Sequence, residues 1–67
     1  MVKINKNTKI VILLGGESLE REISISSGEN ILKSLSSEGF NAIPFDCKGD
    51  FIKKLIKIKP DVCFNAL

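Results

Sequence analysis

Three glutamates and one arginine follow two glycines in the segment GGESLEREIS, residues 15–24. Glycines let the backbone turn sharply and approach a ligand closely, and a helix that begins after such a turn often binds phosphate at its N-terminus. Here the carboxylates outnumber the single guanidinium, so the turn would repel a triphosphate and attract a cationic group such as an ammonium. The segment also lacks the GxGxxG and GK[ST] patterns of nucleotide-binding loops. The charged residues are Glu17, Glu20, Arg21 and Glu22.

A purely structural role explains the same carboxylates. Acidic residues commonly occupy the first turn of a helix, where they complement the helix dipole. In that case Glu17 and Glu22 would face solvent, and Arg21 would pair with a neighbouring glutamate in a weak surface interaction. The residue types alone neither decide between the two roles nor choose one glutamate as the ligand.

The elements on either side of this turn must position it. Lys9 to Leu14, KIVILL, is a continuous β-branched and leucine run, typical of a strand covered on both faces in a parallel sheet. From about Arg21 to Glu38 the period becomes helical, and small residues continue the apolar stripe, which predicts a helix packed closely on the sheet. Glu38 and Gly39 predict its end. The stripe comprises Ser24, Gly28, Ile31, Leu32 and Leu35.

Two capping patterns predict different starts for this helix. Ser18 can cap a helix that begins at Leu19, and Ser26 with Glu29 forms an S-x-x-E capping box further along the chain.

Three further elements are predicted after this helix. Residues 41–46, NAIPFD, predict a short strand, and Pro44 places it at a sheet edge because proline cannot donate a ladder hydrogen bond. Residues 51–58, FIKKLIKI, predict a second helix, and residues 62–67, VCFNAL, predict a third strand. In the second helix the expected apolar face is Phe51, Ile52, Leu55 and Ile56, and the expected solvated face is Lys53, Lys54 and Lys57.

The alternation of strands and helices predicts an α/β fold with a parallel sheet, because crossovers of this kind are almost always right-handed. With the second strand at the edge, the expected strand order is 2-1-3 in a three-layer, Rossmann-like arrangement with one helix on each face. Ligands of such sheets bind outside the carboxyl ends of the strands, at the point where the chain direction switches, and GGESLERE lies there. An apolar third strand with an unpaired edge predicts that the 67 residues are a fragment of a longer chain.

Composition excludes several classes of function. A net charge of +2 without Trp or Tyr argues against a nucleic-acid or membrane partner. The apolar stretch behind the basic start MVKINKNT is too short for a signal peptide, so we expect a cytosolic, cytoplasmic protein. Cys47 and Cys63 are too far apart for a CxxC pair and the chain has no His, so we expect free thiols and no zinc site.

The segment VILLGGESLEREISISSGENIL, residues 11–32, resembles the amino-terminal signature of D-alanine–D-alanine ligases. That signature is a strand ending in LLGG, a turn of small residues, E-R-E-[VI]-S, and a helix carrying Ser-Gly. NAIPFD resembles the family's second strand, and PDVCFNAL resembles the strand before its His-Gly turn. The resemblance covers nearly the whole chain. It implies the amino-terminal, pre-ATP-grasp domain of an ATP-grasp ligase that joins two D-alanines for the peptidoglycan cell wall.

The resemblance also implies where the chemistry takes place. ATP and Mg²⁺ or Mn²⁺ would bind to central and carboxy-terminal domains that are not part of these 67 residues. There the first D-alanine would become D-alanyl phosphate, which the amine of the second D-alanine attacks. The amino-terminal domain would contribute to the site of the first D-alanine and would work with the remaining domains of the same chain.

The resemblance gives individual residues roles in that site. Glu20, by its place in S-x-E-R-E, would accept the substrate ammonium and have a catalytic role in orienting the substrate. Ile23 would lie against the substrate methyl, although packing in the core beneath the turn explains it equally well. Gly15 and Gly16 would line the site. Ser24 and Ser27 are expected to serve helix packing and local hydrogen bonds.

Some features depart from the family pattern or leave other functions open. Leu19 is bulkier than the residue often found at its position. The 67 residues lack nucleotide-binding lysines, metal carboxylates and an oxyanion arginine, so the fragment alone is expected to be inactive. A D-alanine–D-lactate, D-alanine–D-serine or other ATP-grasp ligase would have the same amino-terminal domain. A free-standing flavodoxin-like module that dimerises through its third-strand edge is the alternative from another class, and a homodimer is also common in the ligase family.

Overall fold

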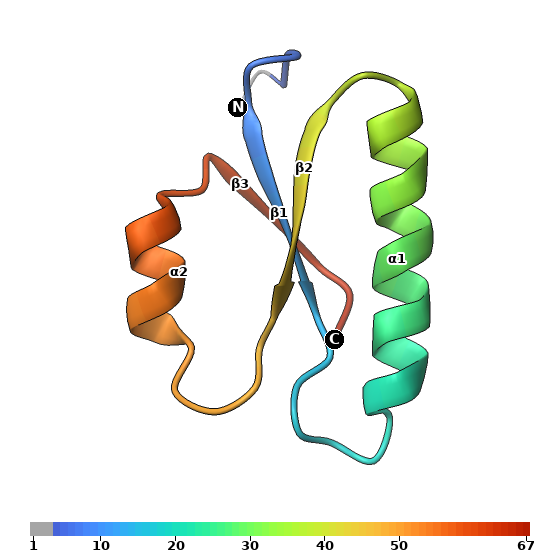
Figure 1. Cartoon of the computed structure of the whole chain (residues 1–67), viewed down its shortest axis with the longest axis vertical. Helices are drawn as coiled ribbons and strands as arrows, with labels where there is room; N and C mark the ends of the chain where they lie inside the picture. Colours follow the sequence, from blue (N-terminus) through green and yellow to red (C-terminus); the bar gives the residue numbers. More distant parts are fainter. Residues whose placement is uncertain (1–3) are drawn as a thin grey trace.

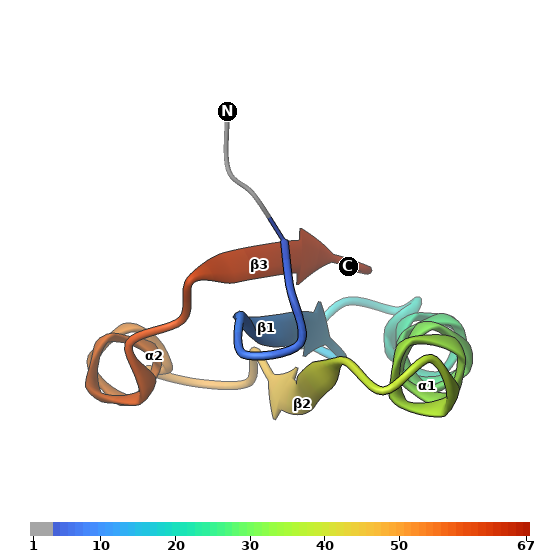
Figure 2. The same cartoon turned by 90° about the horizontal axis from the view of Figure 1, so that it is seen from above.

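Five elements alternate along the chain in the computed structural model, which describes residues 4–67 (Figure 1). They are β1 (Lys9–Leu14), α1 (Arg21–Ser37), β2 (Asn41–Asp46), α2 (Ile52–Ile58) and β3 (Val62–Asn65). The three strands are parallel and lie in the order β2-β1-β3. Seen from above, α1 and α2 lie on opposite sides of the sheet (Figure 2). The predicted α/β fold with three layers and strand order 2-1-3 is confirmed.

The register of the sheet brings the carboxyl ends of the strands to one edge. Leu14, the last residue of β1, lies opposite Asp46, the last residue of β2. On the other side, Leu13 lies opposite Asn65, where β3 ends. The backbone N–H groups of Cys47 and Ala66 then donate to carbonyls of β1 at 2.9 Å each, so the segments beyond β2 and β3 stay beside the end of β1.

The core of the domain is centred on β1. Ile10, Ile12 and Leu14 share one face of the strand and are buried, as is Val11 on the opposite face. The continuous apolar run therefore lies in a strand that is covered on both sides, as its composition predicts. The face with Ile10 packs against half-buried residues of α1 and of the neighbouring strands and loops, namely Ile25, Ile31, Leu32, Leu35, Phe40, Ala42 and Ala66.

Helix α1 begins at Arg21, between the two starts that the capping patterns predict. The Ser18 hydroxyl accepts the Glu20 N–H at 3.2 Å, so Ser18 closes the turn before the helix and is not its N-cap. Ser26 and Glu29 lie inside the helix. The predicted end is confirmed, because the Glu38 N–H donates to the Ser34 carbonyl at 3.3 Å and Gly39 then takes a φ of 86°.

Helix α2 is shorter than predicted and covers the sheet with a different face. It spans Ile52–Ile58, and Phe51 is its N-cap, with its ring edge-on to Phe45 of β2 at 6.2 Å. Leu55 and Ile58 are half-buried, whereas Ile52 and Ile56 are exposed, so the predicted apolar face was wrong in part. A helix of seven residues presents only about one side to a narrow sheet, and the remaining apolar residues face solvent. The three lysines are exposed, as predicted.

The two outer strands also follow their sequences. β2 is an edge strand, and Pro44 lies opposite Ile12 without disturbing the ladder, which confirms the prediction from proline. β3 ends at Asn65 and not at Leu67, because its pairing with β1 ends at Leu13. Within residues 4–67 neither helix is long and apolar enough to cross a membrane.

Candidate functional site

The turn between β1 and α1 lies at the carboxyl edge of the sheet. Gly15 and Gly16 have φ angles of 75° and 80°, a region that residues with side chains rarely adopt. A β-carbon on Gly15 would also lie 2.8 Å from Nη1 of Arg21 and even closer to Asp46. At Gly16 it would meet little beyond Leu67, at 3.5 Å, so backbone conformation rather than space requires glycine there. The two glycines thus let this turn pass close to charged groups of α1 and β2.

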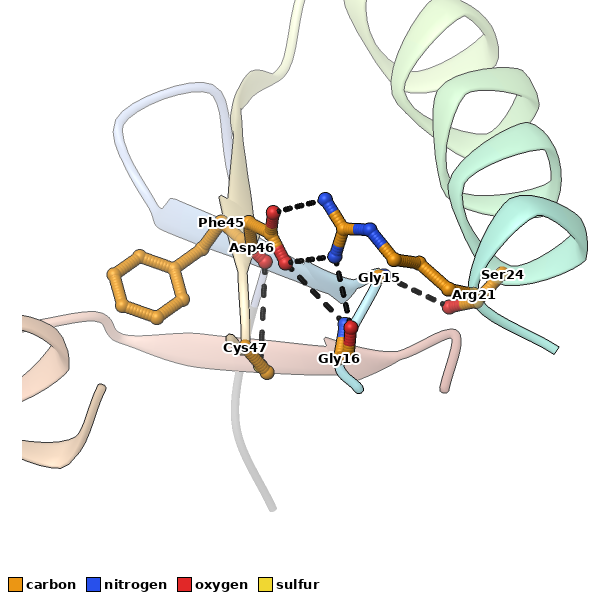
Figure 3. A network of polar contacts seen from close by, with 7 residues as sticks. All are labelled: Gly15, Gly16, Arg21, Ser24, Phe45, Asp46 and Cys47. Atoms are coloured by element: carbon orange, nitrogen blue, oxygen red, sulfur yellow. Dashed lines mark hydrogen bonds and ion pairs between the residues drawn. The ribbon is translucent and has the colours of Figure 1, made fainter. Parts of the chain in front are cut away.

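A bidentate ion pair joins the start of α1 to the end of β2 (Figure 3). The Arg21 guanidinium donates from Nη2 to Asp46 Oδ2 at 2.6 Å and from Nη1 to Asp46 Oδ1 at 2.8 Å. Nη1 also donates to the Gly16 carbonyl at 2.8 Å. Asp46 Oδ1 in turn accepts the Gly16 N–H at 3.3 Å. Both backbone polar groups of Gly16 are therefore bonded to this pair.

The pair determines the charge state of both partners. The hydrogen bond from Arg21 lowers the pKa of Asp46 to about 2, and the Gly16 N–H adds to this effect. The same bond raises the pKa of Arg21. Asp46 is therefore an ionised acceptor at neutral pH, and its charge is matched by the arginine.

This pairing corrects the interpretation that Arg21 would pair with a neighbouring glutamate. Sequence reasoning did not single out Asp46, which lies 25 residues from Arg21 along the chain. The signal was nevertheless present, because Asp46 ends the strand that pairs with β1, and the carboxyl ends of adjacent parallel strands share one edge.

Ser24 connects three segments beneath the turn. Its hydroxyl accepts the Gly15 N–H at 3.0 Å and donates to the Ala66 carbonyl at 2.8 Å. The residue is buried, so both bonds replace contacts with water. The expected role of Ser24 in helix packing and local hydrogen bonding is confirmed, whereas the expected packing role of Ser27 was wrong, because Ser27 is exposed.

Glu20 lies at the end of the turn and directly precedes α1. Its N–H donates to the Ser18 hydroxyl at 3.2 Å, and its carbonyl accepts the Ser24 N–H at 2.9 Å. The residue is exposed, and its carboxylate makes no hydrogen bond to any part of the chain that the structure describes. The backbone of Glu20 is thus bonded on both sides, while its side chain faces solvent.

The apolar residues beside Glu20 are also exposed. Leu19 is fully exposed, and Ile23 is 67% exposed one helical turn beyond it. Ile23 therefore does not pack in the core of this domain, which was one of its two interpretations. Together with Glu20, these residues form a surface at the carboxyl edge that combines one carboxylate with apolar side chains.

Side chains that could bind a metal ion are dispersed in the described part of the chain. No three His, Cys, Asp or Glu side chains gather in a metal-binding arrangement within residues 4–67. Cys47 is buried, Cys63 is exposed, and both are free thiols, as predicted. Burial raises the pKa of the Cys47 thiol. The turn carries an excess of carboxylates, which disfavours a triphosphate.

Fold and site together define a Rossmann-like α/β domain with an acidic glycine turn at the edge where such sheets bind ligands. The chain belongs to the family described as D-ala D-ala ligase N-terminus, which it matches over residues 9–65. The resemblance that the turn and the following helix indicate is thereby confirmed.

Two relatives show how much of a D-alanine–D-alanine ligase the chain matches. It is 51% identical over 63 residues to the D-alanine–D-alanine ligase of Francisella tularensis subsp. novicida, covering 92% of this chain and 21% of that protein. It is 47% identical over 60 residues to the D-alanine–D-alanine ligase of Francisella philomiragia subsp. philomiragia, covering 88% of this chain and 20% of that protein. The chain thus spans about a fifth of the length of the curated relatives it matches.

Proposed function

We propose that the chain is the substrate-contributing amino-terminal domain of a D-alanine–D-alanine ligase that makes D-alanyl-D-alanine for peptidoglycan at the expense of ATP. Family membership over residues 9–65 and 51% identity to a D-alanine–D-alanine ligase support this proposal. The observation that carries it furthest is the position of Glu20, whose exposed carboxylate lies at the carboxyl edge of the parallel sheet.

In this proposal Glu20 accepts the ammonium group of the first D-alanine. Arg21, the neighbouring cation, is already bonded to Asp46 and therefore leaves the Glu20 carboxylate without a partner among residues 4–67. A substrate ammonium would supply that partner in a charge-assisted hydrogen bond. Glu20 orients the substrate, and holding a reactant in the correct geometry lowers the barrier to its reaction.

The neighbouring residues have supporting roles in the same proposal. Ile23 is exposed beside Glu20 and would contact the substrate methyl. Gly15 and Gly16 would line the site with their backbone, because their φ angles form the turn that leads to Glu20.

ATP and the metal ion are assigned to parts of the protein outside these residues, because the acidic turn and the described carboxylates do not fit them. D-alanyl phosphate formation, a cytosolic location and a homodimer stay predictions. The 67 residues alone are expected to show no D-alanine-dependent ATP turnover. Ligases that use D-lactate or D-serine as the second substrate would have the same domain, so the assay must include both compounds.

The test is the substitution Glu20→Gln in the full-length protein. We expect the KM for the first D-alanine to rise about 10- to 100-fold, as loss of one charge-assisted hydrogen bond implies, while the KM for ATP changes less than about 2-fold. ADP release is measured against D-alanine and ATP concentration in turn. Glu22→Gln is the matched control, since it removes a second exposed carboxylate two residues away. Equal effects of the two substitutions would contradict the role of Glu20.

A further inference from the structure

The ion pair between Arg21 and Asp46 is hydrogen-bonded to Gly16, in the turn between β1 and α1 (Figure 3). The guanidinium bonds the Gly16 carbonyl, and the carboxylate bonds the Gly16 N–H. Three donor–acceptor distances in this group lie between 2.6 and 2.8 Å, which is typical of charge-assisted bonds. The orientation of Arg21 is therefore set by β2 and by the turn at once.

Arg21 is also the residue that follows Glu20, so its side chain and the Glu20 backbone move together. The Arg21 N–H donates to the Ser18 carbonyl at 3.2 Å, and the Glu20 N–H donates to the Ser18 hydroxyl. A rotation of the first turn of α1 as a whole would pull the guanidinium away from Asp46. The ion pair thus opposes displacement of the Glu20 backbone, from which the carboxylate extends.

We propose that Arg21 and Asp46 form a positioning pair that holds Glu20 and the Gly15–Gly16 turn in the orientation required by the substrate ammonium. This inference rests on the proposed function. Neither residue of the pair contacts the substrate in this role. They act through the turn and through Glu20.

Exposure distinguishes this role from simple stabilisation of the fold. The Arg21 and Asp46 side chains are 34% and 40% exposed, and ion pairs at such surfaces contribute little to the free energy of unfolding. Placement of a substrate is more sensitive, because a shift of about 1 Å at a site can lower a rate by about 100-fold. Loss of the pair should therefore affect the use of D-alanine more than it affects folding.

The experiment uses the full-length protein with Arg21→Lys and with Asp46→Asn. Lysine keeps the charge but cannot make the two parallel bonds of the guanidinium. We expect each variant to raise the KM for D-alanine by about 5- to 20-fold, because the Glu20 carboxylate is held less firmly in position, and to leave the KM for ATP within about 2-fold. Melting temperatures should fall by less than about 4 °C. Lys33→Gln, which removes an exposed cation from α1, is the control and should change neither KM.

Double variants test whether the pair acts through Glu20. Arg21→Lys combined with Asp46→Asn should be no worse than the more severe single variant, because both break one interaction. Arg21→Lys in a Glu20→Gln background should add less than about 2-fold to the KM for D-alanine, since the carboxylate that it positions is gone. Additive effects in the second double variant would mean that Arg21 acts independently of Glu20 and would overturn the inference.

The remaining outcomes separate this inference from the proposed function. If the unsubstituted protein releases no ADP in response to D-alanine, the proposed function fails. If it does, but both single variants keep their KM for D-alanine or raise both KM values equally, only the positioning pair is rejected. Assays are run below the lowest melting temperature of the set. If both conservative variants are unfolded, the positioning role is also rejected, because the ion pair would then be required for folding.

Discussion

Gly28 of α1 lies directly against Leu14, the last residue of β1. A β-carbon on Gly28 would come within 2.7 Å of the Leu14 β-carbon and within 2.8 Å of one of its δ-carbons. The β-carbon of Leu14 is fixed by the central strand and cannot move aside like the end of a flexible side chain. The distance between α1 and the sheet therefore depends on the absence of a side chain at this position.

Substitution of Gly28 by Ala should destabilise the domain. Overpacking costs about 1–3 kcal/mol, and the better helix propensity of alanine offsets about 1 kcal/mol of that cost, so the free energy of unfolding should fall by up to about 2 kcal/mol. Thermal unfolding of the full-length protein measures it. Ser26→Ala, an exposed change in the same helix, should leave the melting temperature unchanged or raise it. A Gly28→Ala protein more stable than the unsubstituted one would show that α1 does not pack this closely.

Substitution of Ser24 by Ala should loosen the turn from beneath. It leaves the buried Gly15 N–H and the Ala66 carbonyl without their partner, at a cost of about 1–3 kcal/mol. Hydrogen exchange of the Gly15 amide should become faster by about 10-fold or more, since that amide loses its acceptor. Ser27→Ala, at an exposed position on the same helix, is the control. An unchanged exchange rate would rule out the hydrogen bond.

The ion pair predicts how acid affects the domain. Asp46 has a pKa of about 2 in the folded state, below the value of about 3.9 that is usual for an unfolded chain. Its contribution to stability is thus complete above about pH 4 and is lost as the pH falls from about 4 to about 2. Carboxyl carbon shifts followed by NMR report this titration. In Arg21→Gln the Asp46 pKa should move up toward its ordinary value, and titration of Asp46 near pH 4 in the unsubstituted protein would contradict the pair.

Substitution of Ile23 by Ala should affect the substrate and not the fold. A buried isoleucine would cost about 2–5 kcal/mol on truncation, but Ile23 is 67% exposed. We therefore expect little change in melting temperature and, if the proposed function holds, about a 5-fold or greater fall in kcat/KM for D-alanine, because the substrate methyl would lose its apolar contact. Ile56→Ala is a matched control, since Ile56 is also 67% exposed but lies on α2. The same loss of activity in both variants would disprove a contact specific to Ile23.

The fold could be predicted from a few residues with unambiguous physical meaning. The continuous apolar run of β1 requires cover on both faces, and Pro44 excludes β2 from the centre of the sheet. These two facts and the hand of the crossovers leave one strand order. Periodicity was less informative for α2, because four apolar residues in a helix of seven cannot show which of them the sheet will cover.

The position of the glycine turn could be predicted from the sequence, but the ion pair beside it could not. The glycine turn and Glu20 lie between β1 and α1, as the change from strand to helix periodicity predicts. This turn is at the carboxyl edge of the sheet, where parallel sheets bind ligands. The partner of Arg21 was missed because nearest neighbours in sequence suggested a glutamate. Asp46 becomes its partner only through the register that sets it opposite Leu14, and register depends on the assembled sheet.

The central position of β1 also determines the order in which the chain can assemble during synthesis. The ribosome releases this strand first, but both of its neighbours, β2 and β3, follow it in sequence. Helix α1 can form by local contacts as soon as it emerges, whereas the apolar segment KIVILL has no strand to pair with until Asn41–Asp46 has followed. During that interval the segment that later forms the core is an exposed apolar stretch that favours β-structure, which makes it prone to aggregation and a target for chaperones.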